Sequence, residues 1–160
     1  MNELFTHIAV CVDNSEASSA ALDEAWRLKR SMGSVRFSLV HVIRSPIVVA
    51  GHGAMCVQDP SKIAAGAEEW LDEVAAGYPG AEVVLLGGYP QAGVCEWARE
   101  EHIDLLVASS SRGRFDRVLP GSFAGYLARH APCSVLLTRP HVVPEVDDDT
   151  ALTGAMEVGS

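Results

Sequence analysis

The sequence lacks most of the features that mark nucleic-acid-binding, membrane-spanning and secreted proteins. Basic residues are scarce: 12 Lys and Arg stand against 21 Asp and Glu, a net charge of −9 that argues against binding nucleic acid through a basic surface. No apolar run approaches the roughly 20 residues that cross a bilayer. The N-terminal stretch has neither the basic start nor the apolar core of a signal peptide. We therefore expect a cytoplasmic protein without membrane or nucleic-acid partners.

The motifs of the best-known enzyme classes are missing as well. There is no GxGxxG after the first apolar run and no GxxxxGK[ST], which disfavours a dinucleotide enzyme and a P-loop NTPase. No GxSxG elbow presents a serine nucleophile, and the four cysteines are scattered without a CxxC pair. His52 and Cys56 lack a third ligand at a useful spacing, so we expect no metal site there. An enzyme ranks lowest among the candidate functions, because no general base or nucleophile stands out.

What the chain does contain is a regular alternation of apolar runs and amphipathic segments. Five apolar runs are typical of buried strands: His7–Val12, Val35–Ile43, Ala81–Gly88, Ile103–Ser110 and Ser134–Arg139. The segments with helical spacing or helix-start residues are Glu16–Met32, Pro60–Gly77, Pro90–Glu101 and Pro120–His130. This order predicts an α/β protein with a single open, doubly wound five-stranded parallel sheet, covered by helices on both faces. We expect one domain over residues 1–140 and an acidic, disordered tail over 141–160.

Polar residues directly after the predicted strands are the candidates for binding a ligand. In an open α/β sheet, ligands gather at the carboxyl ends of the strands, near the point where the strand order reverses. Asp13 follows the first strand and could accept hydrogen bonds from a ribose or a base. An aspartate that caps a helix or closes a turn is at least as common at such a position.

The loop after the fourth predicted strand has the composition of an anion site. Gly113 and the Gly121–Ser122 pair allow close backbone approach and precede a helix whose first N–H groups point at an anion. Three basic residues suit a polyphosphate: Arg112, Arg114 and Arg117. The alternative is a solvated loop in which Asp116 pairs with an arginine and Ser122 caps the helix. The motif alone favours neither interpretation over the other.

Three stretches together resemble the universal stress protein family: IAVCVDNSE, LVHVI and LPGSFAGYLARHAPCSVLL, within a similarity that extends from His7 to Pro140. The resemblance implies a five-stranded parallel sheet and a homodimer formed through the last strand, Ser134 to Thr138. It also implies a role in stress tolerance or dormancy rather than a defined reaction. A further protein partner is left open.

One branch of that family binds ATP through a Gly-x2-Gly-x9-Gly-Ser/Thr motif. The resemblance places its second glycine at Gly113 and its final pair at Gly121–Ser122. Asp13 matches the family's adenosine-contacting aspartate, and Val42 matches the residue whose backbone meets adenine. Phe123 would supply a further backbone N–H to phosphate. The resemblance therefore implies ATP or another adenine nucleotide as cofactor, with Mg²⁺ alongside it.

The loop departs from this motif in three ways. Ser110 stands where the motif has its first glycine, only seven residues separate Gly113 from Gly121, and Pro120 removes one backbone donor. Arg112 and its neighbours could replace lost backbone contacts or favour AMP or ADP over ATP. The leading hypothesis is a regulatory protein with an altered adenine-nucleotide site. The alternatives are a dimeric interaction module of the same fold that binds no nucleotide and, ranked last, a weak ATP hydrolase.

Overall fold

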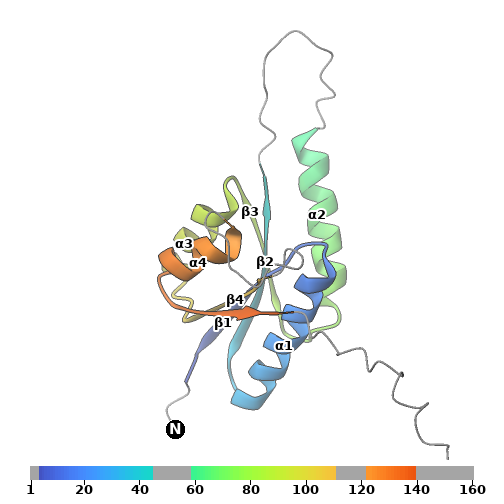
Figure 1. Cartoon of the computed structure of the whole chain (residues 1–160). Helices are drawn as coiled ribbons and strands as arrows, with labels where there is room; N and C mark the ends of the chain where they lie inside the picture. The colour runs from blue at the N-terminus through green and yellow to red at the C-terminus, as the bar shows by residue number, and fades with distance from the viewer. Residues whose placement is uncertain (1–3, 45–58, 111–121, 140–160) are drawn as a thin grey trace, which may run out of the picture.

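The computed structural model describes residues 4–44, 59–110 and 122–139, which form one parallel sheet and the helices that cover it. The strand order is β3-β2-β1-β4-β5. Helices α1 and α2 lie on one face of the sheet and α3 and α4 on the other (Figure 1). The strands are β1 His7–Cys11, β2 Arg36–Ile43, β3 Glu82–Gly87, β4 Leu105–Ser109 and β5 Ser134–Thr138. The predicted doubly wound α/β fold is confirmed.

The helices begin and end close to their predicted positions, with one exception. They are α1 Glu16–Met32, α2 Pro60–Ala75, α3 Pro90–Glu100 and α4 Phe123–His130. The predicted start of the last helix at Pro120 is wrong as a helix boundary, because Ser122 has extended backbone and its hydroxyl caps the helix by accepting the Gly125 N–H at 3.0 Å. Pro120 itself lies outside the described residues.

Two apolar layers form because alternate residues of each strand point to opposite faces of the sheet. Ile8 and Val10 of β1 pack under α1 and α2, whereas Ala9 packs under α3 and α4. The three tryptophans lie in helices and pack on these layers: Trp26, Trp70 and Trp97. Since both faces are covered, the strands are apolar along nearly their whole length.

The turn between α3 and β4 aligns the fourth strand with the first. His102 adopts a left-handed backbone conformation with φ of 53°, and the Ile103 N–H returns to the Ala98 carbonyl at 2.9 Å. This is the Schellman arrangement that ends a helix. Asp104 then binds the start of β1 by accepting hydrogen bonds from the Thr6 N–H at 2.7 Å and the His7 N–H at 3.0 Å. The amino ends of β1 and β4 are therefore fastened together, while their carboxyl ends lead into different connections.

Candidate functional site

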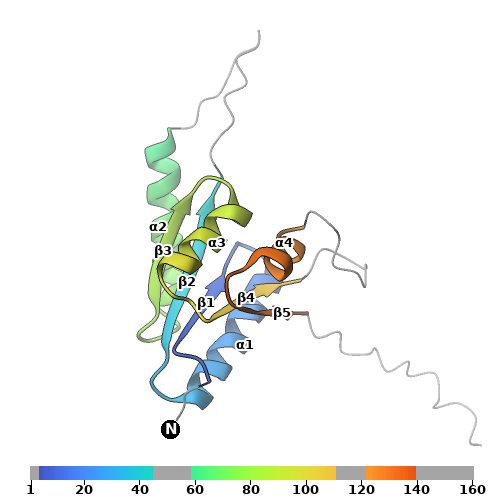
Figure 2. The ribbon, with the colours of Figure 1, turned by 90° about the vertical axis from the view of Figure 1, so that its left-hand side faces the viewer.

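The strand order places a topological switch point between β1 and β4. From β1 the chain moves to β2 and β3 on one side, then crosses back to β4 and β5 on the other. Because β1 and β4 are parallel neighbours, their carboxyl ends lie at the same end of the sheet (Figure 2). Adjacent strands whose connections run in opposite directions leave a crevice at their carboxyl ends. Of the predicted site residues, Asp13, Val42, Ser110, Ser122 and Phe123 lie at this end of the sheet.

Asp13 closes the turn between β1 and α1. Its Oδ1 accepts hydrogen bonds from both the N–H (3.0 Å) and the hydroxyl of Ser15. Its own N–H donates to the hydroxyl of Ser18 at 2.8 Å, and Ser18 is buried. The structural interpretation of Asp13 as a turn aspartate is thus confirmed, and the side chain is at the same time exposed at the switch point. A carboxylate held in this way needs little reorganisation to accept a ligand's hydroxyl.

The backbone of Val42 points toward the space that β1 leaves when it ends. Pairing between β1 and β2 stops at Val40, whose carbonyl accepts the Val12 N–H at 2.9 Å. On the other side, the Ile43 carbonyl accepts the Gly88 N–H at 3.0 Å. Because successive peptide groups of a strand alternate in direction, the N–H and C=O of Val42 face the same side as those of Val40. They therefore face the switch point beyond the last β1–β2 hydrogen bond.

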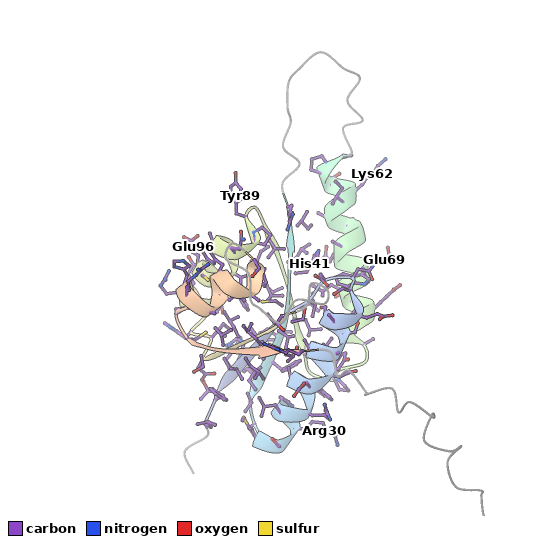
Figure 3. All side chains as sticks on the ribbon, viewed as in Figure 1. Arg30, His41, Lys62, Glu69, Tyr89 and Glu96 are labelled. Atoms are coloured by element: carbon purple, nitrogen blue, oxygen red, sulfur yellow. The ribbon has the colours of Figure 1, made fainter. Side chains whose placement is uncertain are left out.

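His41 is a site residue that the sequence did not reveal. Its Nδ1 lies 2.8 Å from the Val12 carbonyl oxygen, and because a carbonyl only accepts, Nδ1 carries the hydrogen. The ring also meets Trp70 of α2 edge to face, with centroids 5.1 Å apart, and Figure 3 shows it between β2 and α2. This contact holds the peptide group just before Asp13. The one signal in the sequence was a histidine inside the apolar run LVHVI.

Ser110 extends the pairing of β4 with β5. Both its N–H and its hydroxyl donate to the Thr138 carbonyl, at 2.8 and 2.9 Å. Since β5 lies on the opposite side of β4 from β1, the hydroxyl is directed away from the crevice. The serine that replaces the first motif glycine therefore stabilises the last two strands and does not project between β1 and β4.

The start of α4 brings the last described part of the predicted site to the same end of the sheet. The Ser122 hydroxyl accepts the Gly125 N–H and so caps the helix. Phe123 is the first helical residue, a position whose N–H has no partner within a helix. Its side chain packs on the apolar layer under α3 and α4. Three other predicted site residues lie outside the described residues: Arg112, Gly113 and Gly121.

The cysteines among the described residues are neutral thiols. Burial raises the pKa of Cys11, Cys95 and Cys133, so thiolates, the nucleophilic form, are rare at neutral pH. All three are free of disulfides. Within the described ranges, no group of three His, Cys, Asp or Glu side chains is arranged to hold a metal ion. His52 and Cys56 fall outside those ranges. Across the same ranges, no helix is both long and apolar enough to span a membrane.

The fold is that of an open α/β protein with a topological switch point between β1 and β4. The universal stress protein family model matches residues 4–139 of this chain. The chain belongs to the universal stress protein family, as the resemblance implied. Because the match extends over most of the chain, it includes every described strand and helix.

Individual relatives agree with this assignment. A Staphylococcus haemolyticus protein named for the same family is 28% identical over 148 residues, which are 88% of each chain. UspA from Lactobacillus plantarum has a TM-score of 0.68 at 24% identity, over 86% of this chain and all of that one. An Arabidopsis thaliana universal stress protein family protein with AMP bound has a TM-score of 0.59 at 18% identity, over 91% of this chain and 99% of that one. At such identities these structures support the fold.

Proposed function

We propose that this universal stress protein is a regulatory protein that binds an adenine nucleotide at the switch point between β1 and β4. The observation that carries the proposal is the free edge of β2, where the Val42 peptide groups face the space beyond the end of β1. An N–H and a C=O of one residue on the same side of a strand match the acceptor and donor on the edge of an adenine ring. The AMP bound by the Arabidopsis relative supports the same ligand class.

The predicted site residues other than Ser110 and Ser122 then each have a role. Val42 meets the base through its backbone, and the exposed Asp13 carboxylate accepts hydrogen bonds from the ribose. The Phe123 N–H and the start of α4 face the phosphates, since a helix N-terminus favours negative charge. By the resemblance, the residues outside the described ranges complete the phosphate loop: Arg112, Gly113 and Gly121. Mg²⁺ would accompany a di- or triphosphate.

Mass spectrometry of ligand released from protein purified without added nucleotide tests the proposal directly. Thermal unfolding with ATP, ADP and AMP, each with and without Mg²⁺, tests it independently, because a ligand that binds only the folded state raises the Tm. An adenine nucleotide in the released fraction, or a Tm rise that increases with nucleotide concentration, supports it. No retained nucleotide and no Tm change at millimolar concentrations would refute it.

Asp13→Ala is expected to weaken nucleotide binding by about tenfold or more, since a hydrogen bond to a charged group contributes about 1.5–3 kcal/mol. Asp59→Ala is a matched control. Asp59 accepts the Ser61 N–H and hydroxyl at the start of α2, at 3.0 and 2.7 Å, as Asp13 does with Ser15 at the start of α1. Both variants should lose similar stability, and only Asp13→Ala should lose affinity in calorimetry. Equal affinities for the two variants would exclude Asp13 from the site.

The second candidate function is a dimeric interaction module without nucleotide. One observation favours this function: the side chains of Asp13, Ser110 and Ser122 already form hydrogen bonds with other residues of the protein, so each has a structural role without a ligand. This alternative predicts that nucleotides leave the Tm unchanged while the protein is dimeric. The nucleotide titration therefore separates the two functions.

In both cases we propose a homodimer paired through β5, the edge strand beside β4. Val135, Leu136 and Leu137 are half-buried in the single chain and would be covered by a partner strand. The Thr138 carbonyl faces β4 because it accepts the Ser110 N–H, so the alternation of the strand turns the N–H groups of Val135 and Leu137 outward.

Val135→Pro is expected to convert the dimer to a monomer in size-exclusion chromatography with light scattering. Proline removes an outward N–H and leaves the hydrogen bonds from β5 to β4 in place, which is why edge strands tolerate it. Val135→Thr keeps the N–H and the branched shape and should remain dimeric. A dimeric Val135→Pro protein would place the interface elsewhere.

A further inference from the structure

Tyr89 is an exposed aromatic side chain at the ligand-binding end of the sheet. Among the described residues, the large apolar side chains that are mostly exposed are Leu4, at 76%, and Tyr89, at 78%. Leu4 precedes β1 and therefore lies at the amino end of the sheet, whereas Tyr89 follows β3 at the carboxyl end. Figure 3 shows the Tyr89 side chain standing above the turn between β3 and α3. Tyrosine is enriched at binding surfaces, where its ring can be buried while its hydroxyl stays in water.

Local stability does not explain a tyrosine at this position. Tyr89 is the N-cap residue of α3, with φ of −85° and ψ of 116°, and no side-chain hydrogen bond caps the helix. The other three helices each have a capping side chain, from Ser15, Asp59 and Ser122. Ser, Thr, Asp or Asn at position 89 would supply the missing hydrogen bond. The chain thus has an aromatic ring where helix stability favours a small polar residue.

The turn that carries Tyr89 is fastened to the end of β2. The Gly88 N–H donates to the Ile43 carbonyl at 3.0 Å, and Gly88 has a φ of 114° that side chains rarely adopt. Pro90 fixes the backbone on the other side of Tyr89. Tyr89 and Val42 are therefore the sequence neighbours of the two residues that the hydrogen bond to the Ile43 carbonyl joins. A tyrosine ring and a nucleobase together can bridge the interval between them.

We propose that Tyr89 stacks on the base of the bound nucleotide and so selects ligands that contain an aromatic base. The inference rests on the proposed function, since it needs the base to lie at Val42. The exposed ring is free to rotate about its Cα–Cβ bond on a picosecond to nanosecond timescale. Rotation toward Val42 buries one face of the ring against the base, and stacking of this kind strengthens base binding by about fivefold or more. Because its backbone is fixed and its ring can rotate, Tyr89 can lie against one face of the base.

Calorimetry with AMP and with ribose 5-phosphate, which has the same sugar and phosphate but no base, tests this assignment. Tyr89→Ala is expected to weaken AMP binding at least fivefold and to leave the affinity for ribose 5-phosphate unchanged. Tyr89→Phe keeps the ring and should bind AMP within about threefold of the unchanged protein. Leu4→Ala removes the other large exposed apolar side chain of the described residues, at the opposite end of the sheet, and should alter neither affinity.

The outcomes separate this inference from the proposed function. If the unchanged protein binds AMP and Tyr89→Ala binds it equally well, the stacking role is wrong and the nucleotide site stands. Equal losses for AMP and ribose 5-phosphate would also overturn stacking, because the variant would then have disturbed the whole site. If the unchanged protein binds no adenine nucleotide, the proposed function fails and this inference fails with it.

Discussion

Leu127→Ala is expected to lower the free energy of unfolding by about 2–5 kcal/mol, the range for emptying a buried leucine site. Leu127 of α4 is fully buried and belongs to the apolar layer between the sheet and α3 and α4, together with Leu106, Val94 and Ala98. The other buried residues of α4 are small, Ala124 and Gly125. Because an eight-residue helix is too short to be stable alone, this one side chain supplies much of the contact that holds α4 on the sheet.

The same variant should weaken nucleotide binding, because α4 carries Ser122 and Phe123 to the switch point. Urea unfolding gives the stability change, and calorimetry gives the affinity change. Arg129→Ala, an exposed position on the same helix, is the control and should alter stability by no more than about 0.5 kcal/mol. A stability loss below about 1 kcal/mol for Leu127→Ala would show that α4 is held mainly by other contacts.

Stability is expected to fall as the pH drops below about 6.5, and His7 is the cause. His7 is 3% exposed, its Nε2 shares a hydrogen bond with the Ser38 hydroxyl at 2.8 Å, and its Nδ1 has no partner within the described structure. Burial lowers the pKa of His7 below its ordinary value of 6.5, and the nearby Arg36 lowers it further. Glu82, Asp104 and the Glu101 carbonyl act in the opposite direction and do not reverse the shift.

The sign of the effect follows from which state binds the proton. Well above pH 6.5, His7 is neutral in both the folded and the unfolded chain. It then adds no pH dependence to the free energy of unfolding. As the pH falls further, the unfolded chain binds the proton first, so folding loses stability until the folded pKa is reached. One such group gives a slope of at most about 1.4 kcal/mol per pH unit. Urea unfolding at a series of pH values between 5 and 8 measures it.

His7→Gln removes the titration and keeps a partner for Ser38, so it should flatten the slope between pH 5 and 6.5. A second loss at lower pH should survive in this variant. Burial acts to raise the pKa of Asp104, but hydrogen bonds from Thr6 and His7 outweigh it and hold the pKa below its ordinary value of 3.8. Its contribution is therefore present above pH 3.8 and lost below it. An unchanged slope in His7→Gln above pH 5 would assign the effect to another group.

The positions of the candidate site residues were predictable where they depend on a single strand end or helix start. Asp13 and Ser110 follow predicted strands, and Ser122 precedes a predicted helix. Their side-chain partners were only partly predictable. The bonds of Asp13 to Ser15 and of Ser122 to Gly125 join residues two and three positions apart, and such local caps have known sequence signatures. The predicted start of the last helix at Pro120 precedes the true cap, Ser122, which the alternative interpretation of the loop had named, because serine and proline both mark helix starts.

The remaining contacts join residues that are remote in the sequence. The bond from Ser110 to Thr138 spans 28 positions, and that from His41 to Val12 spans 29. Each hydrogen bond depends on which strands are neighbours and on their register. The apolar periodicity of the sequence specifies neither of these. The direction of the Val42 peptide groups has the same origin, since it follows from the residue at which β1 stops pairing with β2.

Local chemistry along the chain therefore accounts for the number and order of strands and helices, the two apolar layers and the polar residues after each strand. Burial drives that pattern, and every strand that is covered on both faces has to be apolar wherever it lies in the sheet. Four features exist only in the folded protein. They are the strand order β3-β2-β1-β4-β5, the direction of the Val42 peptide groups, the hydrogen bond between His41 and Val12, and the position of Tyr89 beside β2. They arise when hydrogen bonds between distant segments select one register among many that the same apolar runs would satisfy.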